Sequence, residues 1–285
     1  MTRLLVTGGG GQLASCLAEL TDDPAFRHLE LHVLGRSELD ITDADTIRTV
    51  VGRIDPDVIV NTAAFTGVDA AESDAGRAGQ VNGDAVAALA RHTDRRLIHI
   101  STDYVFDGTN DSPYVESDPI APLGVYGTTK ERGEAALRSG HPDHLILRTA
   151  WVYSAYGHNF VKTMLRLGAT HDHLRVVDDQ VGCPTSAHDL ARAVLQLATH
   201  DVTGTFHLAG PTAATWYEFA VAIFEAAALD VTVEPIPSSE YPTPAARPAN
   251  SRLDSAAIAE AAGVRLPAWR DSLPRVIEQI RATSD

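Results

Sequence analysis

The sequence predicts an α/β fold: a doubly wound parallel sheet with helices on both faces, joined to a second, smaller domain. Through the first 150 residues, short apolar segments alternate with segments of helical periodicity, which is the pattern of consecutive βαβ units. Four glycines follow the first apolar segment, at positions 8–11. Beyond residue 150 the alternation becomes less regular, so we expect a separate unit there.

The elements of the first half follow in order from the spacing of their apolar residues. The run at 4–7 forms a strand that the glycines stop, and leucines then recur at helical spacing over 12–20. The helix over 43–54 is expected to be capped by Thr42 or Asp43, which can accept from free backbone N–H groups. The expected strands are 4–7, 29–34, 57–61, 96–101 and 145–147, and the expected helices are 12–20, 43–54, 78–92 and 126–139.

In the second half we expect four helices, one strand and a long proline-rich loop. Five of the 15 prolines gather in residues 234–250. Because proline cannot serve in a central strand, this stretch is expected to be an extended loop on the surface. The expected helices are 160–167, 187–198, 216–228 and 257–262, and the expected strand is 205–208.

Charge and composition exclude several classes of protein. The net charge is −15, from 38 acidic and 23 basic residues, so we expect neither nucleic acid nor an anionic membrane among the partners. The first apolar run is too short for a signal peptide or a membrane span. Cys16 and Cys183 match no metal or disulfide spacing, and we expect reduced, buried thiols in a cytoplasmic protein.

The glycine-rich turn between the first strand and the first helix is typical of dinucleotide binding. Small residues there allow a tight turn, close approach of the backbone to a pyrophosphate, and close packing of helix on strand. Gly8, Gly11 and Ala14 have the spacing Gly-x-x-Gly-x-x-Ala, and Gln12 and Leu13 begin the helix whose free N–H groups would face the phosphates. A tight turn without a ligand is the alternative, which the position after the first strand disfavours.

The end of the second strand predicts which dinucleotide binds. NAD sites usually place an acid there to bind the ribose 2′-OH. This chain has Arg36 and Ser37, which suit a 2′-phosphate, although a solvated turn arginine is the alternative. Asp40 and Ile41 could border the adenine. We therefore predict NADPH as the cofactor, with NADH tolerated.

Tyr126 and Lys130 are four residues apart and lie on one face of the expected helix. A ketone that accepts hydride needs a proton on its oxygen, and tyrosine, with a pKa near 10, exchanges its proton poorly at neutral pH. A nearby ammonium is expected to lower that pKa. Thr102 or Ser101, closing the fourth strand, can hold the substrate oxygen. Of the 23 basic residues only Lys130 and Lys162 are lysines, which suggests that arginine would not serve at position 130.

The Tyr-x-x-x-Lys pair and the glycine turn resemble those of the extended short-chain dehydrogenase/reductases. Longer segments carry the same resemblance, which runs from residue 3 to about Leu273. They are NTAAFTGVDAAE at 61–72, STDYVFDG at 101–108, PLGVYGTTK at 122–130, RTAWVY at 148–153, Asn159-Phe160, DQVGCPT at 179–185 and YPTPAARPANSRL at 241–253. The residues expected to bind the cofactor are Gly8, Gly11, Gln12, Leu13, Arg36, Ser37, Asp40, Ile41, Ala63, Ala64, Tyr126 and Lys130.

The resemblance implies reduction of the 4-keto group of dTDP-4-dehydro-L-rhamnose to dTDP-L-rhamnose. It implies that Tyr126 donates the proton, that Lys130 assists it and holds the nicotinamide ribose, and that Thr102 binds the sugar carbonyl region. Further residues are implied for the sugar-nucleotide substrate: Asp103, Tyr104 and Trp151 at the sugar, and Asn159, Arg247, Asn250 and Ser251 near the diphosphate. Arg247 is also expected from charge, because an acidic protein that binds polyanions needs local cations. A core aromatic for Trp151 and a surface ion pair for Arg247 are the alternatives.

We expect residues 1–150 and about 187–210 to form the dinucleotide-binding domain, and residues from about 151–186 and 211–285 to form the substrate domain. Two alternative functions stay open. One is another nucleotide-sugar 4-ketoreductase or an epimerase with the same core. The other is a non-catalytic regulatory subunit, because some proteins that share the resemblance regulate a partner enzyme and keep the same motifs.

We expect no metal ion, and a monomer rather than a homodimer. Some reductases that carry the resemblance bind Mg²⁺ at a dimer interface, partly through a glutamate of the first helix, and Cys16 stands at that position here. A thiol is a soft ligand, whereas Mg²⁺ prefers hard oxygens. Glu19 lies nearly one turn further on and faces a neighbouring direction.

Overall fold

The computed structural model describes residues 1–283, and its central element is a six-stranded, wholly parallel sheet. Its strands are β1 (Thr2–Thr7), β2 (Leu29–Leu34), β3 (Val58–Asn61), β4 (Arg96–Thr102), β5 (His144–Thr149) and β10 (Gly204–His207), in the order β10-β5-β4-β3-β1-β2. The strand order changes direction at β1, which has β2 on one side and β3 on the other. In open sheets of this kind, ligands bind at the carboxyl ends of the strands beside such a switch point.

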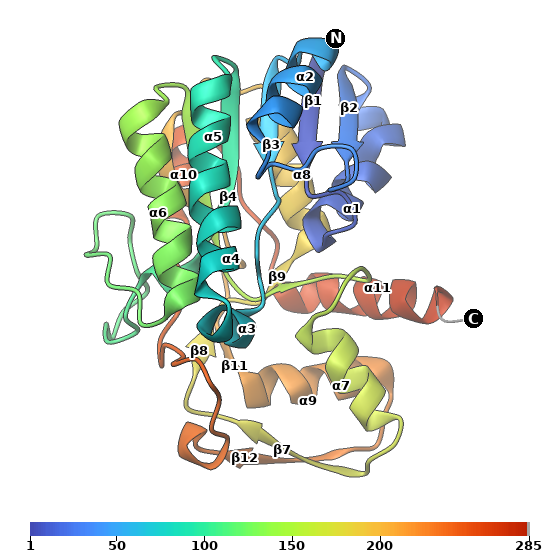
Figure 1. The fold of residues 1–285 in the computed structure, drawn as a ribbon. Helices are drawn as coiled ribbons and strands as arrows, with labels where there is room; N and C mark the ends of the chain where they lie inside the picture. Colours follow the sequence, from blue (N-terminus) through green and yellow to red (C-terminus); the bar gives the residue numbers. More distant parts are fainter. Residues whose placement is uncertain (284–285) are drawn as a thin grey trace.

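Helices cover both faces of the sheet, as the sequence predicts. One face carries α1 (Gln12–Glu19), α8 (Ala187–Leu197) and α10 (Ala256–Ala262), and the other carries α2 (Ala44–Ile54), α5 (Ala85–His92) and α6 (Val125–Gly140). Side chains alternate between two buried cores along each strand, so that Leu4 and Val6 face the first group of helices and Leu5 the second. Figure 1 shows α5 and α6 side by side.

The helix expected over 78–92 is longer and less regular than predicted. It begins as α4 (Ala75–Gly79), passes through a π-helical turn η3 (Gln80–Asp84) and continues as α5. A further short helix, α3 (Val68–Ser73), precedes it and was not expected. The cap of α2 is Asp43, one of the two predicted candidates, which accepts from the N–H groups of Asp45 and Thr46.

The second half forms a separate apolar core below the carboxyl ends of the strands (Figure 1). It is built from α7 (Phe160–Gly168), α9 (Trp216–Ala227) and α11 (Trp269–Ala282), with β7 (His173–Val177) paired to β12 (Thr232–Ile236). Four two-residue strands complete the pairing, β6 (Val152–Tyr153) with β9 (Thr185–Ser186) and β8 (Val181–Gly182) with β11 (Ala214–Thr215). The remaining short helices are η1 (Leu20–Asp22), η2 (Pro24–Phe26), η4 (Asp103–Val105) and η5 (Ser238–Glu240).

One expectation for the second half needs correction, and one helix was not predicted. The loop predicted over 234–250 begins later, because Glu234, Pro235 and Ile236 belong to β12. A two-stranded sheet has only edge strands, where a proline without an N–H group is tolerated. The long helix α11 was not predicted, and it carries Pro274 in its interior. Within residues 1–283, no helix combines the length and apolar character needed to cross a bilayer.

Candidate active site

A cavity of about 640 Å³ opens at the carboxyl ends of β1, β3, β4 and β5. Its walls come from the glycine turn, the loop after β3, the start of η4, α6 and the segment after β5. The predicted site residues on it are Gly8, Gly11, Gln12, Leu13, Ala64, Thr102, Asp103, Tyr104, Tyr126, Lys130 and Trp151. Residues separated by more than 140 positions therefore meet in one cavity.

A second cavity of about 240 Å³ shares Gly8 and Ala64 with the first. Of the residues predicted to bind the adenosine half of the cofactor, Arg36, Asp40, Ile41 and Ala63 line it. Ser37 is exposed and does not line this cavity, and its contact with the cofactor stays a prediction. Arg77 of α4 lines the same cavity, and no sequence signal had marked it.

The glycine turn has the shape that a bound dinucleotide requires. Gly8 and Gly10 have φ of +80° and +89°, a region that residues with a side chain rarely adopt. A Cβ at Gly8 would lie 2.7 Å from the nitrogen of Ala63, so the turn packs directly on the end of β3. A Cβ at Gly10 would meet nothing within 4 Å. The turn is thus closely packed on one side and open on the other, where N–H groups at the start of α1 are free for phosphate.

The Gln12 side chain holds the turn to the second half of the chain. Its Oε1 accepts from Ser154 Oγ at 2.9 Å and from Asn159 Nδ2 at 3.0 Å, and its Nε2 donates to the carbonyl of Val152 at 3.3 Å. Asn159 also caps α7 by accepting from the N–H of Lys162. The amide of Asn159 is therefore occupied within the protein, beside the glycine turn.

Tyr126 and Lys130 are both on the first turns of α6, as predicted, but the expected effect on the tyrosine is wrong. Burial raises the pKa of Tyr126 to about 12, and a hydrogen bond with the Thr102 hydroxyl only partly opposes this. The ammonium of Lys130 is directed elsewhere: it donates to the carbonyl of Ile100 at 2.6 Å and lies 3.2 Å from Nε2 of His99. In this arrangement the phenol holds its proton firmly.

The Lys130 side chain is itself almost fully buried, at 2% exposure. Burial lowers its pKa to about 8, while the negative charge of Glu134 opposes that change. Glu134 lies one turn after Lys130 on the same face of α6, so the four-residue spacing could have indicated that these two side chains are neighbours.

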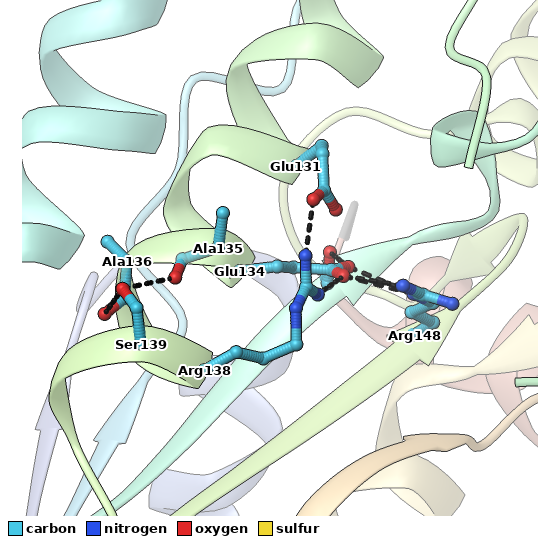
Figure 2. Close-up of polar contacts among 8 residues, drawn as sticks. Glu131, Glu134, Ala135, Ala136, Arg138, Ser139 and Arg148 are labelled. Atoms are coloured by element: carbon cyan, nitrogen blue, oxygen red, sulfur yellow. Dashed lines mark hydrogen bonds and ion pairs between the residues drawn. The ribbon is translucent and has the colours of Figure 1, made fainter. Parts of the chain in front are cut away.

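Glu134 is the centre of a buried ion-pair network (Figure 2). Arg148 of β5 donates to its carboxylate from Nε, at 3.0 and 3.2 Å, and from Nη2 at 2.7 Å. Ser101 donates from β4, and Arg138 approaches from the partly exposed side at 2.8 Å while also binding Glu131. Burial alone would raise the pKa of Glu134, but the hydrogen bonds from Arg148 and Ser101 hold it below its usual value.

Thr102 and Asp103 stand at the end of β4, on the floor of the cavity. Thr102 Oγ1 donates to Asp103 Oδ1 at 2.9 Å and accepts from the N–H of Tyr104 at 3.1 Å. Burial raises the pKa of Asp103 to about 6, against hydrogen bonds from Ser251 and Thr102. Asp103 Oδ2 has no partner within residues 1–283, which leaves an acceptor free for a ligand.

Aromatic rings form the opposite wall of the cavity. Trp151 stacks on Trp216 of α9, with ring centroids 3.4 Å apart and planes 2° from parallel. Its indole Nε1 donates to Ser251 Oγ at 3.1 Å, and Gly182 leaves space against the ring that a Cβ would fill. Trp151 thus lines the cavity and also packs against the apolar core of the second half, so both interpretations of this residue apply.

Arg247 and Asn250 do not line either cavity. Arg247 forms a two-pronged ion pair with Asp69, at 3.1 Å for Nη1–Oδ1 and 2.8 Å for Nη2–Oδ2, which is the alternative that the sequence left open. The amide of Asn250 donates to the carbonyls of Asn110 and Ser112, bracing the loop after η4.

A family model, curated relatives and solved structures all assign the chain to the same family. The family model described as "RmlD substrate binding domain" matches residues 1–282. The chain is 45% identical over 290 residues to a dTDP-4-dehydrorhamnose reductase of Sinorhizobium fredii, with 96% of each chain covered. A crystal structure of a dTDP-4-dehydrorhamnose reductase from Clostridium acetobutylicum has a TM-score of 0.94 at 37% identity, covering 98% of this chain and 100% of that one. A Bacillus anthracis dTDP-4-dehydrorhamnose reductase in complex with NADP has a TM-score of 0.93 at 34% identity, with the same coverage.

Proposed function

The chain belongs to the RmlD substrate binding domain family, and from this premise we propose that it catalyses the NADPH-dependent reduction of the 4-keto group of dTDP-4-dehydro-L-rhamnose to dTDP-L-rhamnose. One observation carries the proposal. Tyr126, Lys130 and Thr102 line the same cavity as the glycine turn, at the carboxyl ends of the central strands.

The residues present fit NADPH. The turn at Gly8–Gly11 is open at Gly10, and Arg36 and Arg77 supply two cations to the smaller cavity, where a 2′-phosphate would add negative charge. Gln12, Leu13, Ala63 and Ala64 would border the dinucleotide between the two cavities. When bound, the cofactor supplies the hydride.

Tyr126 is the group that we assign to protonation of the carbonyl oxygen. With its pKa raised to about 12, the phenol keeps its proton at neutral pH and is present as the acid. Giving up that proton leaves a phenolate in a buried place, which is costly without a compensating charge. The nearest groups that could stabilise it are the Lys130 ammonium, one helical turn away, and the Thr102 hydroxyl, which would turn its proton from Asp103 to the phenolate.

On the substrate side, Asp103 offers its free Oδ2 to a sugar hydroxyl, and Tyr104 and Trp151 supply apolar ring surface. Arg247, Asn250, Ser251 and Asn159 stay predictions for the nucleotide diphosphate. Arg247 would have to leave, or share, its ion pair with Asp69 to bind it. We further propose that the second core, around α7, α9 and α11, is the substrate domain, divided from the dinucleotide-binding domain near residues 150, 187 and 210. Within the segment after residue 210, α10 returns to the central sheet and packs with the dinucleotide-binding domain.

A monomeric, metal-free enzyme in the cytoplasm completes the proposal. Cys16 and Cys183 are free and buried, as expected for a reducing compartment. Glu19, the nearest carboxylate to the first-helix position, accepts a hydrogen bond from Tyr156. Within residues 1–283, no group of three or more His, Cys, Asp or Glu side chains is placed to hold a metal ion.

The test is NADPH consumption by the purified protein with dTDP-4-dehydro-L-rhamnose, followed as loss of absorbance at 340 nm, with the sugar product identified by NMR. We expect one NADPH oxidised for each sugar reduced. An epimerase would change the sugar without net oxidation, and a regulatory subunit would oxidise no NADPH with any keto sugar nucleotide. Either result would refute the proposal.

A further inference from the structure

A row of three buried polar side chains leads from the glycine turn to Lys130. Thr7 ends β1, Asn61 ends β3 and His99 lies near the end of β4, and the strand register places them directly beside one another. Each has 0% exposure. Polar groups so deeply buried are normally retained only with their hydrogen bonds satisfied.

The row is continuous in its contacts. Thr7 Oγ1 lies 2.6 Å from Asn61 Oδ1, Asn61 Nδ2 lies 3.0 Å from His99 Nδ1, and His99 Nε2 lies 3.2 Å from Lys130 Nζ. Both ring nitrogens of His99 are used by these two neighbours. Burial, and then the charge of Lys130, hold the pKa of His99 well below its usual value, so the imidazole is neutral.

A neutral imidazole has one N–H and one bare nitrogen, and this links its tautomer to the charge of Lys130. If Lys130 is an ammonium, it only donates, so Nε2 must be bare and Nδ1 must donate to Asn61. In the structure Thr7 Oγ1 donates to Asn61 Oδ1, and Asn61 Nδ2 faces His99 Nδ1. The ammonium form therefore requires the Asn61 amide to turn over, so that its oxygen faces His99 and its NH₂ group faces Thr7; the two ends of an amide have nearly the same shape. If Lys130 is a free amine, every bond in the row runs the other way.

We propose that His99, in the tautomer that donates from Nδ1 to Asn61, is a positioning residue that stabilises Lys130 as the ammonium. Its Nε2 is then the second acceptor of that ammonium, beside the carbonyl of Ile100. The role of this ammonium in reduction rests on the proposed function, whereas the hydrogen-bonded row itself does not.

The other charged groups near Lys130 are not altered by a change at His99, so the effect of His99 on the Lys130 pKa can be measured separately. On α6 itself, Glu134 favours the charged lysine, and the Tyr126 phenol is uncharged at neutral pH. Arg148, from β5, is bound to Glu134. From β4, His99 is the side chain that contacts Nζ, so changing it alters one acceptor and no formal charge.

The chain has only two lysines, which permits a direct experiment without substrate or cofactor. Protein labelled with ¹³C-lysine gives two Cε signals, which the Lys162→Arg variant assigns. NMR follows the chemical shift of each signal as pH rises and gives a titration midpoint for each lysine. The matched variants are His99→Gln, whose distal amide can replace Nε2, and His99→Asn, whose shorter amide can replace only Nδ1.

We expect His99→Asn to lower the Lys130 midpoint by about one pH unit, a tenfold change that is typical of losing one hydrogen bond to a charged group. His99→Gln should restore most of it, and the Lys162 midpoint should not move. A Lys130 midpoint that is unchanged or raised in His99→Asn would overturn the proposal.

If His99→Asn does not fold, Thr7→Val tests the coupling from the other end of the row. Valine keeps the shape of the threonine side chain but removes its hydroxyl. A shift of several tenths of a pH unit in the Lys130 titration midpoint is expected, and no change would refute the coupling. The basic limb of the kcat profile should move with the NMR midpoint. If the Lys130 titration midpoint shifts as expected but the protein has no reductase activity, the proposed function is refuted and the role proposed for His99 is supported.

Discussion

Replacing Arg148 with methionine should destabilise the protein far more than the same replacement at Arg138. Both arginines bind the carboxylate of Glu134, but their surroundings differ. The Arg148 side chain is 2% exposed and Arg138 is 33% exposed, while Glu134 is 0% exposed. Methionine is unbranched and adaptable, so the change removes charge and donors more than volume.

The magnitude follows from burial. Removing one partner of a buried pair leaves the other charge uncompensated and costs about 3–5 kcal/mol. At roughly 2–4 °C for each kcal/mol in a chain of this size class, Arg148→Met should lower Tm by about 6–20 °C. Arg138 is four residues from Glu134 and partly exposed, so water screens its charge, and Glu134 keeps Arg148 when Arg138 is replaced. A helical pair with an exposed arginine contributes about 0.3–0.5 kcal/mol, so Arg138→Met should lower Tm by about 1–2 °C.

Calorimetry at pH 7 measures both variants and the double variant Glu134→Leu/Arg148→Met. Because the double variant removes both buried charges together, it should recover most of the lost stability. The reasoning is refuted if Arg148→Met and Arg138→Met lower Tm by similar amounts, or if the double variant is no more stable than Arg148→Met alone.

Three further outcomes are expected. Tyr126→Phe should lower kcat by about 10²–10⁴-fold with an unchanged Tm, whereas Tyr217→Phe, outside the cavity, should keep wild-type turnover; a Tyr126→Phe enzyme of normal rate would exclude the proposed proton donor. Arg36→Ala should raise KM for NADPH about tenfold and leave KM for NADH nearly unchanged, because Asp40, now unpaired, would also repel the 2′-phosphate; equal effects on both cofactors would show that Arg36 does not contact it. EDTA should change neither activity nor the monomeric sedimentation coefficient, and a chelator-sensitive dimer would contradict the metal-free monomer.

The sheet and most of its helices could be predicted from the sequence because their patterns are local. Short apolar runs marked the strands, the first two of which are followed by glycine, and Asp43 marked the start of α2. The errors lie where long-range pairing decides the structure. Pro235 lies in a strand only because β7 offers it an edge partner, which no local pattern contains.

The candidate site was predictable in its residues but not in its electrostatics. The four-residue spacing of Tyr126 and Lys130 placed both on one wall of the cavity. It could not indicate that Lys130 donates to Ile100, or that burial raises the pKa of Tyr126 instead of lowering it. Which group an ammonium contacts depends on strand register, and the register of β4 against β3 brings His99 beside Asn61.

The buried pair and the reacting groups are parts of one charge arrangement. Glu134 lies between Arg148, with which it forms an ion pair, and Lys130. Its negative charge raises the pKa of Lys130 and so opposes the effect of burial, which favours the neutral amine. If the carboxylate had no arginine, it would lose the hydrogen bonds that hold its own pKa down, and a protonated Glu134 could not support Lys130. Burial of Arg148 is thus tied to the charge of a lysine on another element. The same argument explains why charged groups are retained in this interior, where apolar side chains of similar volume would pack at lower cost.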